Sequence, residues 1–263
     1  MDARAIAMGI AFALMWSSAF TSARIIVADA SPLFSLALRF LVSGLIGVGI
    51  ALALGQTWRL NRNQWRATII FGVCQNALYL GLNFVAMQTV QASLAAIVAA
   101  TMPLLVALAS WLLFKERLKP LGIAGLLAGV LGVGLIMGTR INEGVDLYGV
   151  ALCAIGVVAL TVATLALRGA TSGGNFMMVV GLQMLVGSSI LLVVALLFED
   201  IYVNPTLPLA LAFAYTTLFP GLIATFIWVL LLNRIGPMRA ATFHFLNPVF
   251  GVAVAAVLLG ERL

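Results

Sequence analysis

The chain is a succession of long apolar runs that short polar turns interrupt. Nine of these runs reach the length of about 20 residues that a membrane-spanning helix needs. They predict spans near residues 4–27, 33–55, 66–88, 92–114, 121–138, 147–168, 175–198, 207–232 and 238–260. Turn-forming pairs such as Asn204-Pro205 and Gly236-Pro237 separate the runs. Because the connections are short, we expect each helix to lie antiparallel to the next.

One pattern occurs in both the fourth and the ninth run. Each run contains a proline, Pro103 or Pro248, and closes with Glu-Arg-Leu, at 116–118 or 261–263. The offset is constant, since 248 minus 103 and 261 minus 116 both give 145. Equal spacing between a proline and a charged pair indicates an internal duplication. The sequence therefore predicts two related halves.

The two halves differ after the shared pattern. The first continues into the apolar run 121–138, whereas the second ends with the sequence at Leu263, so we expect the second half to lack a tenth helix. The expected organisation is a five-helix repeat at 1–138, an external connector at 139–146 and a second repeat at 147–263. Because five is an odd number of spans, the second repeat should enter the membrane from the opposite side, which makes the duplication an inverted one.

Composition agrees with this fold class, an all-α polytopic membrane protein. Hydrophobic residues make up 63% of the chain and charged residues 8%, whereas a soluble domain carries about 25% charged residues. The net charge of +6 comes without a basic arm or interleaved aromatics, so nucleic acid is not an expected partner. The charge instead reports on topology.

Lys and Arg are enriched in short cytoplasmic loops, and their distribution here predicts a cytoplasmic N-terminus. With that orientation the external side receives only Arg24, Arg140 and Arg262. The cytoplasmic side receives Arg4, Arg59, Arg62, Arg66, Lys115, Arg117, Lys119, Arg168, Arg234 and Arg239. We expect a multi-pass protein of the bacterial inner membrane.

Motifs for enzymatic chemistry are missing from the sequence. Cys74 and Cys153 lie in apolar runs without a CxxC spacing, and neither a phosphate-binding loop nor an HExxH motif is present. No acidic residue falls inside an expected span. We therefore expect no cofactor, no metal and no enzymatic activity; a membrane-embedded enzyme or a non-transporting membrane scaffold remains as the alternative.

The motifs together resemble a known family. The first run reads Gly-Ile-Ala-Phe-Ala-Leu-Met-Trp-Ser-Ser-Ala-Phe over 9–20, and the fourth runs from Ala95-Ala96 through Pro103 to Glu-Arg-Leu at 116–118. With the duplication, this resembles the drug/metabolite transporter superfamily in its EamA-type branch, and most of all the YddG-type exporters of aromatic amino acids. The resemblance implies ten spans with both termini cytoplasmic, transport of small metabolites, and a pathway lined by helices 1, 3, 4, 6, 8 and 9.

Transporters built from inverted repeats bind substrate near the bilayer midplane, often where Pro or Gly breaks a helix. Pro103 and Pro248 cannot donate to the carbonyls of Ala99 and His244, so we expect broken helices and unpaired carbonyls at both places. His244 is the only histidine and lies one turn from Asn247. We expect this pair to line a cavity, and the alternative is packing against a neighbouring helix.

The third span carries a polar stripe of Asn76, Tyr79 and Asn83, which either lines the cavity or joins helices. We expect Arg39 to reach the outer headgroups and Trp228 to anchor at the interface or face lipid. The candidate substrate-binding residues are Trp16, Ser17, Asn76, Tyr79, Asn83, Met102, Pro103, Phe243, His244, Asn247 and Pro248.

These residues suggest the substrate class and the coupling. Aromatic rings beside amides, with no fixed buried charge, favour a small amphiphilic substrate such as an amino acid with a large apolar or aromatic side chain. His244 is the one intramembrane side chain that could couple transport to protons; we favour a facilitator, since the histidine has no carboxylate partner. We expect a monomer, with a dimer through the glycine-rich helices 33–55 and 121–138 as the alternative.

Overall fold

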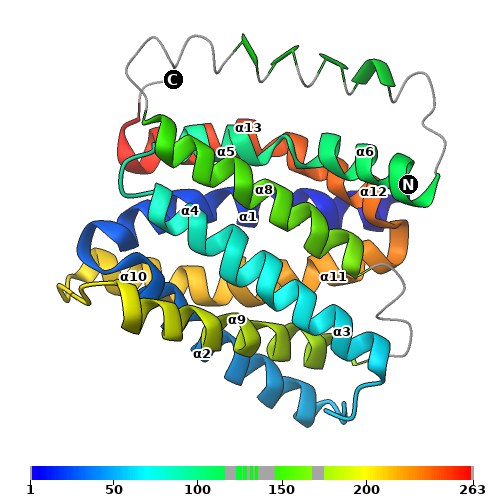
Figure 1. Cartoon of the computed structure of the whole chain (residues 1–263), viewed down its shortest axis with the longest axis horizontal. Coiled ribbons are helices and arrows are strands. Elements are labelled where there is room, and N and C mark those ends of the chain that lie inside the picture. The colour runs from blue at the N-terminus through cyan, green and yellow to red at the C-terminus, as the bar shows by residue number, and fades with distance from the viewer. Residues whose placement is uncertain are drawn as a thin grey trace.

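A computed structural model describes residues 2–115, 123–125, 127–128, 131–132, 134–135, 146–167 and 175–261 of the chain. This part is almost entirely helical, with one isolated β-bridge between Ala30 and Val203. Figure 1 shows the helices packed side by side. The elements are α1 (Ala3–Asp29), α2 (Pro32–Ala53), α3 (Arg62–Phe71), η1 (Gly72–Leu80), α4 (Gly81–Ala86), α5 (Ala92–Ala99), α6 (Met102–Phe114), α8 (Leu147–Ala166), α9 (Phe176–Phe198), α10 (Leu207–Thr216), η2 (Thr217–Ile223), α11 (Ala224–Ile235), α12 (Pro237–Ala241), η3 (Thr242–Leu246) and α13 (Asn247–Leu259).

These elements join into eight helices in the described residues that are long and apolar enough to cross a membrane. They are Ala3–Asp29, Pro32–Ala53, Arg62–Ala86, Ala92–Phe114, Leu147–Ala166, Phe176–Phe198, Leu207–Ile235 and Pro237–Leu259. Each corresponds to one of the nine spans that the apolar runs predict. The one remaining predicted span, near 121–138, falls largely outside the described residues. The predicted fold class is confirmed, while the repeat boundaries at 1–138 and 147–263 stay a prediction.

The two halves share their helix irregularities. A π-helical segment begins at Gly72 in the third span and at Thr217 in the seventh described span. A fresh α-helix begins at Met102 and at Asn247 after a break in the preceding helix. Both pairs lie 145 residues apart, the same offset as the sequence repeat. The duplication is therefore visible in backbone geometry as well as in sequence.

Helix α1 occupies the centre of the bundle. It contacts α5 and α13 as well as α10 and α11, and in Figure 1 it runs between the layer that contains α5 and α13 and the layer that contains α10 and α11. Its side chains Phe12, Trp16 and Phe20 are all buried. These three residues recur every fourth position and so lie along one helical stripe, which is the stripe that meets the candidate site.

The pair α2 and α9 packs at glycine contacts. A Cβ atom on Gly181 of α9 would lie 2.6 Å from the backbone nitrogen of Val48, and one on Gly47 would lie 3.1 Å from the Cα of Gly181. The glycines are needed because the two backbones approach closely. Gly44 and Gly47 of helix 33–55 thus serve packing within the chain at this face. A Cβ on Gly49, Gly125, Gly132 or Gly134 would meet nothing within 4 Å, so the dimer alternative stays untested.

Two carboxylates cap helix N-termini across the bundle. Glu199 accepts the backbone N–H groups of Leu33 and Phe34 at 2.8 and 2.9 Å, at the start of α2. Glu261 accepts those of Ala92 and Ser93 at 2.9 and 3.0 Å, at the start of α5. The first turn of a helix has unpaired donors and a positive dipole end, so both contacts are favourable. Glu261 therefore ties the end of α13 to the start of α5.

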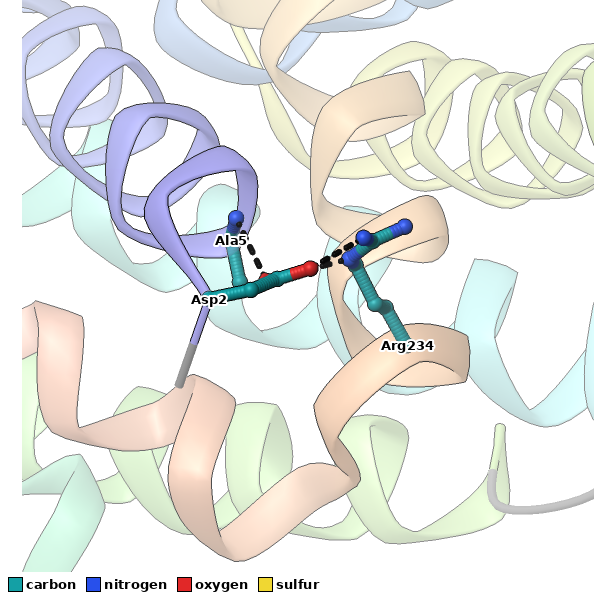
Figure 2. A network of polar contacts seen from close by, with 3 residues as sticks. All are labelled: Asp2, Ala5 and Arg234. Atoms are coloured by element: carbon teal, nitrogen blue, oxygen red, sulfur yellow. Dashed lines mark hydrogen bonds and ion pairs between the residues drawn. The ribbon is translucent and has the colours of Figure 1, made fainter.

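A third carboxylate joins the start of the chain to the end of α11 (Figure 2). Asp2 accepts the N–H of Ala5 at 3.1 Å and pairs with Arg234, whose Nε lies 3.3 Å from Oδ1. The hydrogen bond from Arg234, and then that from Ala5, lowers the pKa of Asp2 to about 2. The contact is solvent-exposed, so it links two helix ends without burying charge.

Candidate functional site

A small pocket lies between α1, α2, the third span and η2. Its lining includes Trp16, Arg39, Tyr79, Asn83, Phe84 and Pro220. The volume is about 20 Å³, room for about one water molecule. The pocket therefore combines aromatic, amide and cationic groups but is too small in this conformation to hold a metabolite.

A wider cavity of about 640 Å³ lies on another face of α1, between α10 and α13. Its lining is mainly apolar, and the hydroxyls of Ser18 and Tyr215 are hydrogen-bonded to each other at 2.7 Å. Thr21 Oγ1 also lies at this wall and has no hydrogen-bond partner among the described residues, but none of the described lining residues carries an amide or a charge. A mainly apolar wall with hydroxyls alone offers little to fix a polar substrate. We therefore place the candidate site in the smaller pocket.

The rings of Trp16 and Tyr79 form one wall of that pocket. Their centroids are 6.1 Å apart and the planes are nearly parallel, at 4°. Both side chains are buried, and Phe20 and Phe84 add further apolar surface. The wall is suited to a flat or branched apolar group.

On its other side Trp16 borders an aromatic enclosure around His244. The imidazole is met edge-on by Phe12, Trp16 and Trp228 at centroid distances of 5.3, 6.0 and 5.2 Å. Phe12 and Trp228 also stack on each other at 4.6 Å. His244 is 1% exposed, and its Nε2 has no hydrogen-bond partner among the described residues. The histidine is thus enclosed by rings and does not line the pocket.

Three polar side chains form a chain from α1 to η3. The Ser17 hydroxyl donates to Asn247 Oδ1 at 3.1 Å, and Asn247 Nδ2 lies 3.0 Å from His244 Nδ1. An amide nitrogen can only donate, so Nδ1 is the acceptor and the ring proton of a neutral imidazole sits on Nε2. The arrangement favours an uncharged histidine that links the first helix to the second half.

The polar stripe of the third span divides between two roles. Asn76 donates to the backbone carbonyl of Gln183 on α9 at 2.9 Å, and to that residue's side-chain oxygen. Asn83 donates to the carbonyl of Tyr79 on its own helix at 2.7 Å and lines the pocket. Asn76 thus lies at a helix interface, while Tyr79 and Asn83 face the pocket.

Both prolines lie where the sequence places a break, in the first turn of α6 and α13. The predicted unpaired carbonyl at His244 is wrong, because the N–H of Asn247 donates to it. Met102 is fully buried, and the ring of Phe243 packs against α1 at Gly9, where a Cβ would come within 2.2 Å of it. Neither Met102, Phe243 nor the prolines at 103 and 248 line the pocket.

Three further expectations are wrong. Arg39 does not reach outward: it is 2% exposed, lines the pocket, and its guanidinium carbon lies 4.5 and 5.7 Å from the ring centroids of Phe40 and Phe84. The expected absence of a buried charge is therefore wrong too. Trp228 is 1% exposed and packs on His244, so it is not lipid-facing. The signal for Arg39 was its presence inside an apolar run, since an ionisable residue there generally faces the protein interior or a wet cavity.

The described residues contain no cluster of three or more His, Cys, Asp or Glu side chains that could hold a metal ion. What the site offers is a set of hydrogen-bonding, stacking and cationic groups. Such a set can bind and release a small molecule. The groups positioned here fit recognition of a solute.

Comparison with known proteins gives relatives along the whole chain. The chain is 23% identical to the uncharacterized transporter YvbV of Bacillus subtilis, over 95% of this chain and 82% of the relative. It is 28% identical to the uncharacterized inner membrane transporter YedA of Escherichia coli K12, over 97% and 83%. A partial match at 30% identity, over 51% of this chain and 46% of the relative, is to the aromatic amino acid exporter YddG of Ancylobacter novellus.

The fold also has a solved counterpart. A crystal structure covers all of this chain with 91% of its own length matched, at a TM-score of 0.77 and 24% identity, which shows a common fold. The family model described as the EamA-like transporter family matches residues 3–138 and again 147–263. Two matches in tandem agree with the two repeated halves. The chain therefore belongs to the EamA family of the drug/metabolite transporter superfamily.

Proposed function

We propose that this transporter exports small amphiphilic metabolites, foremost amino acids with a large apolar or aromatic side chain. The observation that carries the proposal is the parallel pair of Trp16 and Tyr79 beside the Asn83 amide in a buried pocket. Rings supply surface for an apolar side chain, and the amide can bond a polar head. The partial similarity to an aromatic amino acid exporter supports the same class.

We also propose alternating access as the mechanism. A pocket of about 20 Å³ is too small for any amino acid, so helices must separate to admit one. Glu261 holds α5 and α13 together at one end of the bundle, and the pair of Asp2 and Arg234 holds α1 and α11 at the other. Opening toward one side would release the contact at that end and leave the other in place.

The coupling that the site supports is facilitated transport. His244 accepts from Asn247, is enclosed by aromatic rings and has no carboxylate partner among the described residues. A lone neutral imidazole is a sparse proton relay. The substrate would then run down its own gradient.

Three parts of the setting belong to the proposal. The N-terminus lies in the cytoplasm of a bacterium, the protein acts as a monomer in the inner membrane, and its partners are the lipid bilayer and a small-molecule substrate. The excess of Lys and Arg on one side supports this orientation. Reporters fused after Phe114 and after Leu54, both predicted on the cytoplasmic side, should give cytoplasmic signals.

Flux from sealed proteoliposomes tests the function. Vesicles loaded with labelled phenylalanine, leucine, glutamate or glucose should release the first two faster than protein-free vesicles. Glutamate and glucose should remain inside. Release of sugars or of no solute at all, by protein that elutes as a folded species, would refute the proposed substrate class.

A further inference from the structure

Arg39 lies deep in the bundle. It is two turns into α2, or about 10 Å along the helix axis from Pro32, and it is 2% exposed. Its guanidinium lies over the rings of Phe40 and Phe84. No carboxylate of the described residues forms an ion pair with it. The charge is therefore buried without a protein anion.

A buried arginine needs a compensating interaction. Charges in a low-dielectric interior are costly unless paired and hydrogen-bonded, and two ring faces supply only part of the compensation. The Nε–H of Arg39 is buried and has no hydrogen-bond partner in the described part of the chain. The side chain thus keeps donor capacity that the protein does not use.

Arg24 on α1 provides the contrast. It lies 15 positions earlier, and its Nη1 donates to the backbone carbonyls of Met87 and Val90. The hydrogen-bond donors of Arg24 are therefore used at the end of the third span, and its role is structural. Arg39 instead borders the pocket beside the ring wall and Asn83.

We propose that Arg39 binds the carboxylate of the transported substrate. This rests on the proposed function and adds the recognition of the polar head to it. A guanidinium offers parallel N–H donors that match a carboxylate's two oxygens. A carboxylate at this position would pair the charge and place its apolar substituent toward the ring wall of Trp16 and Tyr79.

The pocket offers a charged partner for the carboxylate of an amino acid but none for its ammonium group. No Asp or Glu of the described residues lines it, so no anion awaits the ammonium group. Asn83 donates its N–H to Tyr79 and leaves only a neutral oxygen as a possible acceptor. The substrate class is therefore an aromatic or large apolar monocarboxylate, in which the carboxylate is required and the α-amino group is dispensable.

Calorimetric binding to the purified full chain tests this, with four probes of one scaffold: L-phenylalanine, 3-phenylpropionate, L-phenylalaninamide and 2-phenylethylamine. The two carboxylates should bind the wild type at least tenfold more tightly than the amide and the amine. Arg39→Gln should lose about tenfold or more of the affinity for 3-phenylpropionate but little for 2-phenylethylamine. Arg39→Lys keeps the charge without the paired N–H donors of the guanidinium, and its affinity for 3-phenylpropionate should lie between those of the wild type and Arg39→Gln.

Arg24→Gln is the matched control, since it removes an arginine from the same region and should leave the preference for carboxylates unchanged. Comparing the four probes on the wild type keeps the test decisive if a variant does not fold. Equal binding of acid and amine, no binding of either acid, or unchanged affinity in folded Arg39→Gln would overturn the proposal. The flux assay separates the two claims: aromatic amino acid flux without a carboxylate requirement removes the role of Arg39 and leaves the transport function standing.

Discussion

The indole of Trp16 on α1 lies parallel to the phenol ring of Tyr79 on η1, with centroids 6.1 Å apart. This distance is near the upper end of the range for rings in contact. The same indole meets His244 edge-on at 6.0 Å. Trp16 therefore forms a wall between the pocket and the aromatic enclosure, and joins the third span to the second half.

Substitution of Trp16 should selectively weaken the binding of aromatic substrates. Stacking between rings contributes about 0.5–1.5 kcal/mol beyond burial, so Trp16→Leu should raise the dissociation constant of phenylalanine roughly 2- to 10-fold. Trp16→Phe keeps a ring, and its dissociation constant should lie between those of the wild type and Trp16→Leu. Trp111 is 51% exposed on α6, and Trp111→Leu serves as the control with unchanged affinity. The measurement is calorimetric binding; equal affinities in all three variants would contradict the placement of the substrate.

Loss of Asn247 should destabilise the protein more than loss of Ser17. Asn247→Ala leaves Ser17 and His244 buried without their partner, and an unsatisfied buried group costs about 1–3 kcal/mol. Ser17→Ala leaves only one group, Asn247 Oδ1, without its partner and should cost less, about 1 kcal/mol. The midpoint of detergent-induced unfolding measures both. Ser189 is exposed and its hydroxyl bonds within its own helix, so Ser189→Ala is the control and should leave the midpoint unchanged. A larger loss of stability for Ser17→Ala than for Asn247→Ala would contradict the arrangement in which Asn247 bonds both Ser17 and His244.

The spans and the helix breaks were predictable because they depend on local chemistry. A run of apolar residues of sufficient length defines a span, and a proline cannot continue the helical hydrogen bonds. Both signals are in the sequence near Pro103 and Pro248, and the structure starts α6 and α13 at the adjacent residues.

The side-chain roles were less predictable because they depend on which face of a helix meets which neighbour. Trp228 occupies an apolar run, and nothing local says whether it turns inward; for Arg39 the apolar run favours an inward position but does not say which neighbours it meets. Asn76, Tyr79 and Asn83 share a stripe in an ideal α-helix, but the π-helical stretch Gly72–Leu80 shifts their register. Asn76 then meets Gln183 on α9 while the other two face the pocket.

Adding a methyl group at Gly181 should separate α2 from α9. The new Cβ would lie 2.6 Å from the backbone nitrogen of Val48, which cannot rotate away. Overpacking of this kind costs about 1–3 kcal/mol. Gly49→Ala is the control, because its Cβ meets nothing within 4 Å and alanine favours a helix by about 1 kcal/mol over glycine. The thermal unfolding temperature in detergent should fall for Gly181→Ala and stay the same or rise for Gly49→Ala. The opposite order would exclude the close contact between α2 and α9.

The pair of Asp2 and Arg234 predicts that the stability of the folded state depends on pH only in the acidic range. Since the pKa of Asp2 is lowered from 3.8 to about 2, the ionised carboxylate stabilises the folded state above about pH 4. That contribution is lost as the pH falls through about 2. The unfolding temperatures of wild type and Asp2→Asn should therefore differ at pH 6 and converge toward pH 2. A difference that grows on acidification would have the wrong sign for a lowered pKa.

The coupling prediction concerns the protonation of His244. Its Nδ1 accepts from Asn247 at 3.0 Å, and aromatic rings of Phe12 and Trp228 cover the imidazole. Protonation would add a second N–H where an amide donor already points, and would place a charge among apolar rings. A facilitator has no need of that step. His244→Gln keeps hydrogen-bonding capacity and cannot titrate near neutral pH, so it should retain substantial flux.

Proteoliposomes with and without an imposed pH gradient provide the measurement. For wild type and His244→Gln alike, phenylalanine should equilibrate down its own gradient at a rate that changes little when the pH gradient is applied. His244→Leu separates bonding from titration, because it also leaves Asn247 without an acceptor and should lose stability. Uphill accumulation by the wild type that disappears in His244→Gln would replace the facilitator with proton-coupled transport and make His244 the coupling residue.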